Sequence, residues 1–191
     1  MIRSINPASG EQLAGFEAHD AAAVEQRLAA AVVAQRAWRQ RSVLDRMPLL
    51  TALAQALRAN IEPWSRLITL EMGKPLAEAR AEIEKCAMTC DFYAANAPAM
   101  LNDEPVASAA SDSRVVYDPL GVLLAVMPWN YPFWQAVRAI VPALAAGNAV
   151  LLKHASNVPQ CALALERLFV QAGTPPGLFA TLLVGAPTVA P

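Results

Sequence analysis

The sequence predicts an α/β fold with N-terminal helices, an incomplete doubly wound parallel sheet and a projecting β ribbon. Two observations support this prediction. The first hundred residues are rich in alanine and carry apolar residues at helical spacing. From Gly121 onward, short apolar runs alternate with helical patterns. The connections between these runs are too short for anything but right-handed parallel crossovers.

Length and composition limit the classes of function. A chain of 191 residues can form one substantial domain, or one domain with a projecting element. The longest near-continuous apolar run, 122–128, is far shorter than the roughly 20 residues that span a bilayer. A net charge of −1 gives no indication of nucleic acid or a membrane as a partner. Three cysteines without framework spacing, and no signal-peptide pattern, favour the cytoplasm.

The first part of the chain, residues 1–99, is expected to be helical. Asp20 and Ser42 can cap the first two helices, and Gly73 allows a left-handed stop to the third. Helices are expected at 21–39, from Ser42 onward, from Pro63 to Met72, and from Pro75 to about Ala97.

The second part begins with a ribbon at 100–119, formed by a loop at 98–113 and a strand at 114–117. Residues 120–191 then give a β-α-β-α-β pattern. Its strands are expected at 122–127, 149–153 and 179–184, and its helices at 133–146 and 159–172. The first strand is expected to be buried on both faces. This pattern is typical of one mononucleotide-binding half of a Rossmann-like sheet.

The segment after the first of these strands is chemically unusual, because Trp129, Asn130 and Tyr131 stand between Pro128 and Pro132. Ligands of open α/β sheets bind beyond the carboxyl ends of the strands. No G-x-G-x-x-G loop follows the strand, so a pyrophosphate held at this turn is not supported. Asn130 offers a fixed neutral donor, which suits an oxyanion developing from a carbonyl. The alternative is that Asn130 only caps the following helix.

The other candidate residues have ordinary alternatives. Lys153 ends the second strand and can meet a cofactor ribose or phosphate, or simply extend into solvent. His154 is expected in a loop rather than as a base, because no carboxylate lies near it in sequence, and His19 is expected at the surface. Cys86 and Cys90 share a helical face, which formally permits a metal pair. No metal site is predicted, and buried structural thiols are expected.

Two stretches resemble a known family. They are "GVLLAVMPWNYPFWQAVRAIVPALAAGNAVLLKHASNVP" at 121–159 and "EMGKP" at 71–75. Together they are similar to the N-terminal part of the aldehyde dehydrogenase superfamily, and most similar to its succinate-semialdehyde dehydrogenases. The resemblance runs from about Ile5 to the last residue. The combination of P-W-N-[YF]-P with A-G-N-x-x-[LV]-K is highly specific.

The resemblance implies NAD- or NADP-dependent oxidation of an aldehyde, succinic semialdehyde, to its acid through a cysteine thiohemiacetal. It implies that Asn130 is the oxyanion-hole amide and that 105–118 form an oligomerisation ribbon, with a dimer or tetramer in the full-length form. The cofactor-binding residues that it implies are Pro128, Trp129, Lys153, Ser156 and Gly185.

Two departures from the family pattern matter. Ser156 stands where many members carry Glu in K-x-x-E, and serine relaxes the barrier against NADP. The chain also lacks the later G-S-x-x-x-G turn, the E-L-G-G general base and the cysteine nucleophile, so a catalytic domain is expected to be absent. An inactive N-terminal fragment or truncated reading frame is therefore expected. The alternatives are a non-catalytic nucleotide-binding or oligomerisation module, and an unrelated βαβ domain.

Overall fold

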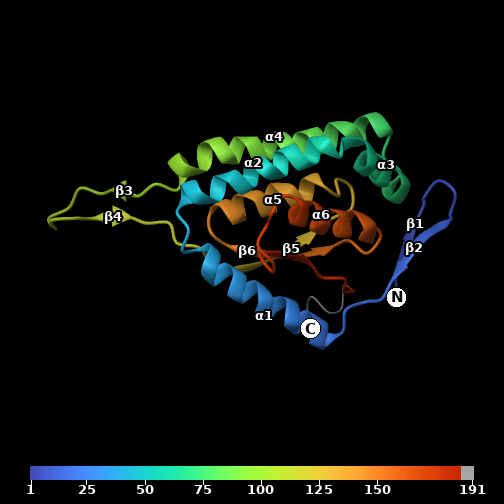
Figure 1. Cartoon of the computed structure of the whole chain (residues 1–191), viewed down its shortest axis with the longest axis horizontal. Coiled ribbons are helices and arrows are strands. Elements are labelled where there is room, and N and C mark those ends of the chain that lie inside the picture. The colour runs from blue at the N-terminus through green and yellow to red at the C-terminus, as the bar shows by residue number, and fades with distance from the viewer. Residues whose placement is uncertain (186–191) are drawn as a thin grey trace.

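Helices account for most of the chain in this computed structural model, which describes residues 1–185 (Figure 1). The helices are α1 (Ala21–Trp38), α2 (Val43–Ala59), α3 (Ile61–Met72), α4 (Leu76–Met100), α5 (Trp134–Ala145) and α6 (Pro159–Gln171). The strands are β1 (Ile2–Ile5), β2 (Gln12–Phe16), β3 (Glu104–Pro105), β4 (Arg114–Val115), β5 (Val122–Met127), β6 (Ala149–His154) and β7 (Phe179–Thr181). None of the helices within 1–185 is long and apolar enough to cross a membrane. The predicted α/β class is confirmed.

The central sheet has three parallel strands in the order β5-β6-β7. Its register pairs Met127 with His154 and Leu152 with Thr181. Helices α5 and α6 pack on one face and are covered by α2, α3 and α4, while α1 lies across the other face (Figure 1). The predicted 120–191 unit thus contains the expected β-α-β-α-β pattern, and its last six residues lie outside the described range.

Helix α5 is tied to the N-terminal helices at its carboxyl end. The last carbonyl groups of a helix have no partner within it and need donors from elsewhere. Here Trp38 Nε1 donates to the Leu144 carbonyl at 2.8 Å, and Arg46 Nη1 donates to that of Ala145 at 2.8 Å. These side chains come from α1 and α2, so the helical half fixes the position of the first helix of the sheet unit.

The expectation that β5 is buried on both faces is wrong. Leu124 and Val126 are 52% and 51% exposed, whereas Ala125 on the opposite face is buried. β5 is an edge strand of the described sheet, and α1 crosses only part of its outer face. The β5 part of this face is therefore apolar and uncovered, whereas Leu151 and Lys153, which lie opposite on β6, are buried.

Two further boundaries differ from expectation. β7 ends at Thr181 instead of residue 184, because the Leu183 backbone pairs with His19 rather than with β6. Helix α4 continues through Pro98, where a loop was expected. Proline removes only its own N–H from the last turn, and the Leu101 N–H still donates to the Ala97 carbonyl at 3.0 Å.

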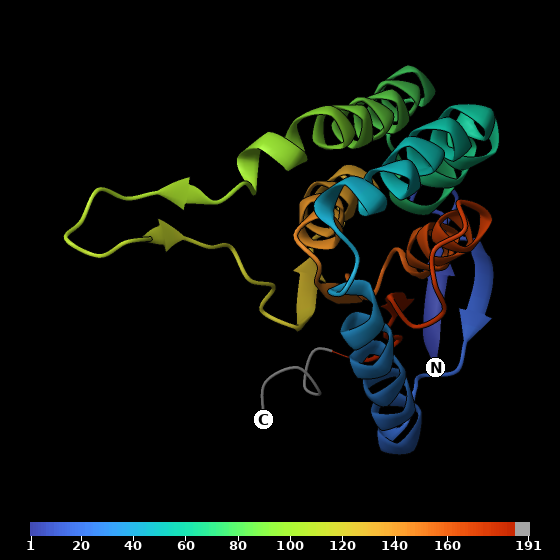
Figure 2. The same cartoon turned by 60° about the vertical axis from the view of Figure 1, so that its left-hand side comes forward.

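Two antiparallel ribbons complete the fold. The predicted ribbon is present as β3 and β4, which pair Glu104 with Val115 and project from the body (Figure 2). The second ribbon, formed by β1 and β2, is not predicted from the sequence. It docks on α6 through the buried Ser4 hydroxyl, which accepts a hydrogen bond from Gln160 Nε2 at 2.9 Å.

Candidate functional site

The predicted site residues gather at the carboxyl edge of the parallel sheet. The turn at 128–130 follows β5 directly, and its residues are exposed, with Trp129 at 50%. Because Met127 is paired with His154, this turn begins beside the segment that carries Ser156. Gly185, the last described residue, follows β7 at the same edge. The sheet therefore brings the predicted residues of three strands to one edge.

Asn130 does not cap α5. The helix has Phe133 at its N-cap position and no side-chain cap bond from that residue. Instead, Glu82 Oε1, from α4, accepts hydrogen bonds from the Phe133 and Trp134 amides at 2.8 and 3.0 Å. Within residues 1–185, no hydrogen bond involves the Asn130 side chain. The Asn130 amide is thus left available at the surface of the turn.

Glu82 is itself paired. Its other oxygen, Oε2, accepts from the ammonium of Lys74, and both side chains are almost fully buried. The same ammonium lies 3.6 Å from the centroid of the Tyr131 ring, in the turn that carries Asn130. A buried charge is tolerated only when it is paired and hydrogen-bonded, and both conditions are met here.

A second buried carboxylate caps the neighbouring helix. Glu71 Oε1 and Oε2 accept from the amides of Gln160 and Cys161, at 2.8 and 2.7 Å, where α6 begins. The first N–H groups of a helix lack internal partners and carry the positive end of its dipole, so a carboxylate stabilises them. The N-termini of both helices of the βαβαβ unit are therefore capped by a glutamate from the N-terminal helices.

His154 is not a loop residue, as the sequence suggested, but the buried last residue of β6. Its Nδ1 accepts from the Ala155 amide at 2.8 Å, so Nε2 carries the proton and donates to the Pro132 carbonyl at 2.8 Å. Burial lowers the pKa of His154, which keeps the ring neutral. His154 thus has a structural contact to the turn rather than the surroundings of a base.

Lys153 faces the opposite side of the sheet from His154, because successive side chains of a strand alternate. It is opposite Val126 in the register and so shares a face with the exposed Leu124 and Val126. No ion pair or hydrogen bond within the described residues engages the Lys153 ammonium. Lys153 is only 7% exposed, so the alternative that it extends into solvent is wrong. A buried ammonium with no described partner is suited to an anionic or hydroxyl-rich ligand.

All three cysteines are free and buried. Burial raises the pKa of Cys86 and Cys161 well above the ordinary value, and that of Cys90 to about 12. A thiol attacks as its thiolate, so these groups are poor nucleophiles near neutral pH. The expectation of structural thiols agrees with these positions.

A pocket of about 370 Å³ lies where α4 meets the first turns of α5. Trp134 makes an edge contact with Tyr131 and lies beneath two cations. The Lys85 ammonium is 3.7 Å and the Arg138 guanidinium 5.0 Å from its ring centroid. Aromatic and thioether side chains line the remaining wall: Met88, Phe92 and Tyr93. This pocket therefore combines apolar walls with positive charge next to the Asn130 turn.

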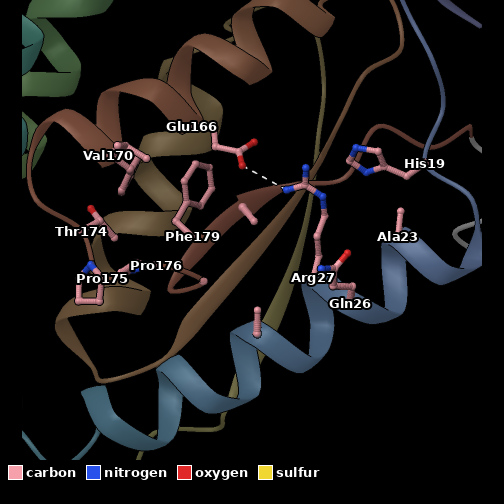
Figure 3. Close-up of a pocket in the computed structure, with 14 residues that line it drawn as sticks. His19, Ala23, Gln26, Arg27, Glu166, Val170, Thr174, Pro175, Pro176 and Phe179 are labelled. Carbon is pink, nitrogen blue, oxygen red and sulfur yellow. Dashed lines mark hydrogen bonds and ion pairs between the residues drawn. The ribbon is translucent and has the colours of Figure 1, made fainter.

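A second pocket, of about 480 Å³, lies between α1, α6 and the loop before β7 (Figure 3). Its polar groups engage one another. Arg27 reaches across it to Glu166 at 3.2 Å, and Glu166 Oε2 accepts from the Thr181 amide at 3.2 Å. His19 was expected only at the surface, but it is half-buried here, and its Nδ1 accepts from the Leu183 amide at 3.2 Å. None of the predicted site residues lines this pocket.

Sequence reasoning missed the buried glutamates and Lys74. Glu71 and Lys74 lie in the "EMGKP" stretch, which carried the resemblance but received no role. Glu82 was missed although a signal existed, because it lies on the apolar stripe of α4, three residues after Ala79 and four before Cys86. A carboxylate on such a stripe must find a partner inside the protein.

Comparison with known proteins identifies the chain. The model of the family described as "Aldehyde dehydrogenase family" matches residues 1–190. The chain belongs to the aldehyde dehydrogenase family. The resemblance found in the sequence is thereby confirmed.

Several relatives of this aldehyde dehydrogenase chain are succinate-semialdehyde dehydrogenases. A probable NADP⁺-dependent one from Synechocystis is 49% identical over 96% of the chain and 40% of its own length. An NAD(P)⁺ enzyme from Escherichia coli is 45% identical over 94% of the chain and 39% of its own length. The chain therefore spans about two-fifths of the length of these curated relatives.

Solved structures of the aldehyde dehydrogenase family agree with the fold. A succinic semialdehyde dehydrogenase from Streptococcus pyogenes, in complex with NADP⁺, superposes with a TM-score of 0.95 at 30% identity. It covers 99% of this chain, which in turn covers 42% of the enzyme. The predicted Rossmann-like architecture is confirmed, whereas the roles of Asn130 and of the cofactor-binding residues stay predictions.

Proposed function

We propose that this chain forms the cofactor-binding part of an NAD(P)-dependent aldehyde dehydrogenase that oxidises succinic semialdehyde to succinate. The observation that carries the proposal is the carboxyl edge of the sheet. There Asn130 presents an exposed amide with no described partner, and Lys153 holds a buried cation with no described partner beside the exposed Val126. Relatives with 45% and 49% identity are named for this substrate and for NAD(P)⁺ or NADP⁺.

The residues present fit a nicotinamide dinucleotide. Lys153 can bind ribose hydroxyls or a 2′-phosphate, and the exposed apolar face around Leu124 and Val126 offers a surface for flat rings. Ser156 is exposed and uncharged, so it does not repel a 2′-phosphate. Pro128, Trp129 and Gly185 complete the proposed cofactor edge. When bound, the dinucleotide supplies a hydride acceptor.

Asn130 acts on the aldehyde oxygen in this proposal. Attack by a cysteine thiolate turns the carbonyl oxygen into an oxyanion, and a neutral, fixed amide donor stabilises that charge. The attacking thiolate does not come from this chain, because its three cysteines are buried and their pKa values are raised. The chain alone is therefore expected to have no dehydrogenase turnover.

The pocket beside the turn supports a substrate with a carboxylate. Succinic semialdehyde is an anion at neutral pH, and Arg138 and Lys85 lie over Trp134 and line this pocket. Arginine binds carboxylates in a bidentate manner. We assign the carboxylate end of the substrate to this pair and the aldehyde end to Asn130.

Cofactor binding tests the proposal directly. Titration calorimetry of the 191-residue chain is expected to detect binding of both NADP⁺ and NAD⁺. Lys153→Met is expected to weaken the affinity for NADP⁺ about ten-fold or more, since it removes a charge-assisted contact. Ser156→Glu is expected to lower the affinity for NADP⁺ about ten-fold and to leave the affinity for NAD⁺ unchanged, because a carboxylate repels the 2′-phosphate. Equal affinities in all three proteins contradict the assigned edge.

Turnover gives the second test. NADPH formation from succinic semialdehyde is measured with the chain alone and with the full chain fused to the remaining part of the Synechocystis relative. The fusion is expected to be active and the chain alone inactive. If the chain alone produces NADPH absorbance above a no-enzyme control, the proposal that the attacking thiolate lies outside this chain is contradicted.

A second candidate function is a non-catalytic module that associates with a complete subunit. The uncovered edge strand β5 and the projecting ribbon favour it, since an unpaired strand edge can accept another strand. The homo-oligomer and the cytoplasmic location expected from the sequence remain proposals. Light scattering of the chain alone, and mixed with a full-length relative, separates a monomer from a self-associating or subunit-binding module.

A further inference from the structure

Each of the four residues after Asn130 contacts a buried polar side chain from another element. Tyr131 is exposed, whereas Pro132 and Phe133 are buried, so the contacts hold the segment from its inner side. The contacts are Lys74 Nζ over the Tyr131 ring at 3.6 Å, His154 Nε2 to the Pro132 carbonyl at 2.8 Å, and Glu82 Oε1 to the Phe133 and Trp134 amides at 2.8 and 3.0 Å.

We propose that Lys74, Glu82 and His154 form a clamp that positions Asn130 for the reaction. This inference rests on the proposed function, because it matters only if the Asn130 amide meets the oxyanion. Asn130 is exposed, and its side chain makes no hydrogen bond within residues 1–185, so the backbone of the turn alone determines its place. The three clamp residues fix that backbone from the carboxyl side.

The neighbouring helix shows that a helix cap alone does not require this arrangement. Glu71 caps α6 with two backbone bonds, and no ion pair within the described residues involves it. Glu82 caps α5 through Oε1 alone and binds Lys74 through Oε2, and the Lys74 ammonium lies over the Tyr131 ring. The additional lysine links the cap to the residue next to Asn130, which is what a positioning role needs.

The clamp also joins the two strands that form the site. His154 ends β6, directly after the proposed cofactor residue Lys153, and its ring bonds the turn that follows β5. The distance between the Asn130 turn and the Lys153 edge is therefore held by a hydrogen bond between these strand ends. A shift of about 1 Å in a reacting group can cost about a hundred-fold in rate.

The first experiment observes Asn130 without turnover. In ¹⁵N-labelled full chain, Glu82→Gln is expected to speed amide exchange of Phe133 and Trp134 about ten-fold. It is also expected to shift the side-chain amide resonances of Asn130. The matched control Glu71→Gln is expected to speed exchange of Gln160 and Cys161 and to leave the Asn130 resonances in place.

A second pair of variants avoids the buried charges. Tyr131 is 44% exposed, so Tyr131→Leu is expected to fold. It removes the ring beneath the Lys74 ammonium and is expected to shift the Asn130 resonances, whereas Tyr131→Phe keeps the ring and is expected to retain them. Unchanged Asn130 resonances in both Glu82→Gln and Tyr131→Leu overturn the inference and reduce Glu82 to a helix cap.

The second experiment measures rate in the active fusion described above. Glu82→Gln and Tyr131→Leu are expected to lower kcat about ten-fold or more with KM for NADP⁺ unchanged, because Asn130 acts on charge that develops only in the transition state. Glu71→Gln serves as the stability-matched control, with kcat near that of the unsubstituted fusion.

Asn130→Ala in the fusion separates the two proposals. The proposed function expects it to lower kcat about a hundred-fold or more. An unchanged kcat in Asn130→Ala overturns the role of Asn130 itself. A large loss in Asn130→Ala together with unchanged kcat in both Glu82→Gln and Tyr131→Leu overturns only the clamp.

Discussion

The two faces of the parallel sheet are built very differently. On one face, α5 and α6 pack beneath α2, α3 and α4, and residues such as Ile140 and Leu144 are fully buried. On the other face lies α1, and beside it Leu124 and Val126 are half exposed. Buried glutamates hold the helices of the first face at their N-termini, whereas the second face presents Lys153 without a described partner.

The two faces therefore differ in role: one supports the backbone of the site, and the other can bind a ligand. The covered face fixes the backbone of the site, since α5 is tied at both ends by side chains from α1, α2 and α4, and α6 is tied at its N-terminus by Glu71 of α3. The second face has exposed apolar surface along β5, next to the buried Lys153, and exposed apolar surface is typical of a region that another molecule or chain segment covers.

The largest expected effect compares one apolar truncation on each face. Ile140→Ala should lower the free energy of unfolding by about 3 kcal/mol, because it leaves a cavity in a closed core. Leu124→Ala should cost less than about 1 kcal/mol, because its side chain is already half in water. Urea denaturation followed by circular dichroism measures both. Equal losses would show that the second face is as well packed as the first.

The attachment of α1 gives the next effect. Gly177 has φ +84°, and a Cβ built there meets the Ala30 carbonyl oxygen of α1 at 2.7 Å. Gly177→Ala should therefore destabilise the chain by about 2–3 kcal/mol. Gly173→Ala is the matched control, since φ is +82° but no atom lies within 4 Å, and it should cost only about 1 kcal/mol. Equal costs in thermal unfolding would mean that α1 is not held closely at this point.

A smaller effect is expected at the carboxyl end of α5. Trp38→Phe removes the donor to the Leu144 carbonyl, and the free energy of unfolding should fall by about 1–2 kcal/mol. Trp129→Phe is the control on the half-exposed turn and should change stability by less than about 0.5 kcal/mol. A loss in Trp129→Phe as large as in Trp38→Phe, measured in the same urea titration, would reverse this ranking.

The smallest effect is a pH dependence that involves only two histidines. Burial lowers the pKa of His154, and burial with the nearby Arg27 cation lowers the pKa of His19, from an ordinary value of 6.5. The unfolded chain then binds more protons than the folded chain below that value. Stability is complete above pH 6.5 and falls as the pH drops from 6.5 toward the lowered pKa values.

Unfolding free energies measured between pH 7.5 and pH 5.5 check this sign. His154→Gln should flatten the slope more than His19→Gln, because His154 is the more deeply buried of the two. A stability that rises on acidification would contradict the neutral, hydrogen-bonded state assigned to His154.

Local sequence patterns predicted most of the elements correctly. The caps at Asp20 and Ser42 and the left-handed Gly73 are present as expected, because they depend only on residues within one turn. The order of strands and helices after Gly121 also follows from the apolar runs and their spacing. The same patterns placed Asn130 and Ser156 after strand ends and Lys153 at a strand end, and all three lie at the carboxyl edge of the sheet.

Contacts across the chain were not predictable in this way. The caps of α5 and α6 come from Glu82 and Glu71, which lie 51 and 89 residues before the amides they first bind. The exposure of β5 depends on which strands and helices flank it. A run of six apolar residues has the same sequence pattern in an edge strand as in a central strand. His154 likewise appeared to be a loop residue until its bond to the Pro132 carbonyl placed it in the core.

The sequence by itself determined the family, the α/β class and the chemical groups at the carboxyl edge of the sheet. These properties depend on local motifs and on the period of apolar residues. Only the tertiary structure decided that Glu82, rather than Asn130, caps α5 and that Lys74 and His154 hold the same turn. The reason is physical: a buried charge or N–H is satisfied by whichever partner the packing brings within hydrogen-bonding distance, and sequence separation does not restrict that choice.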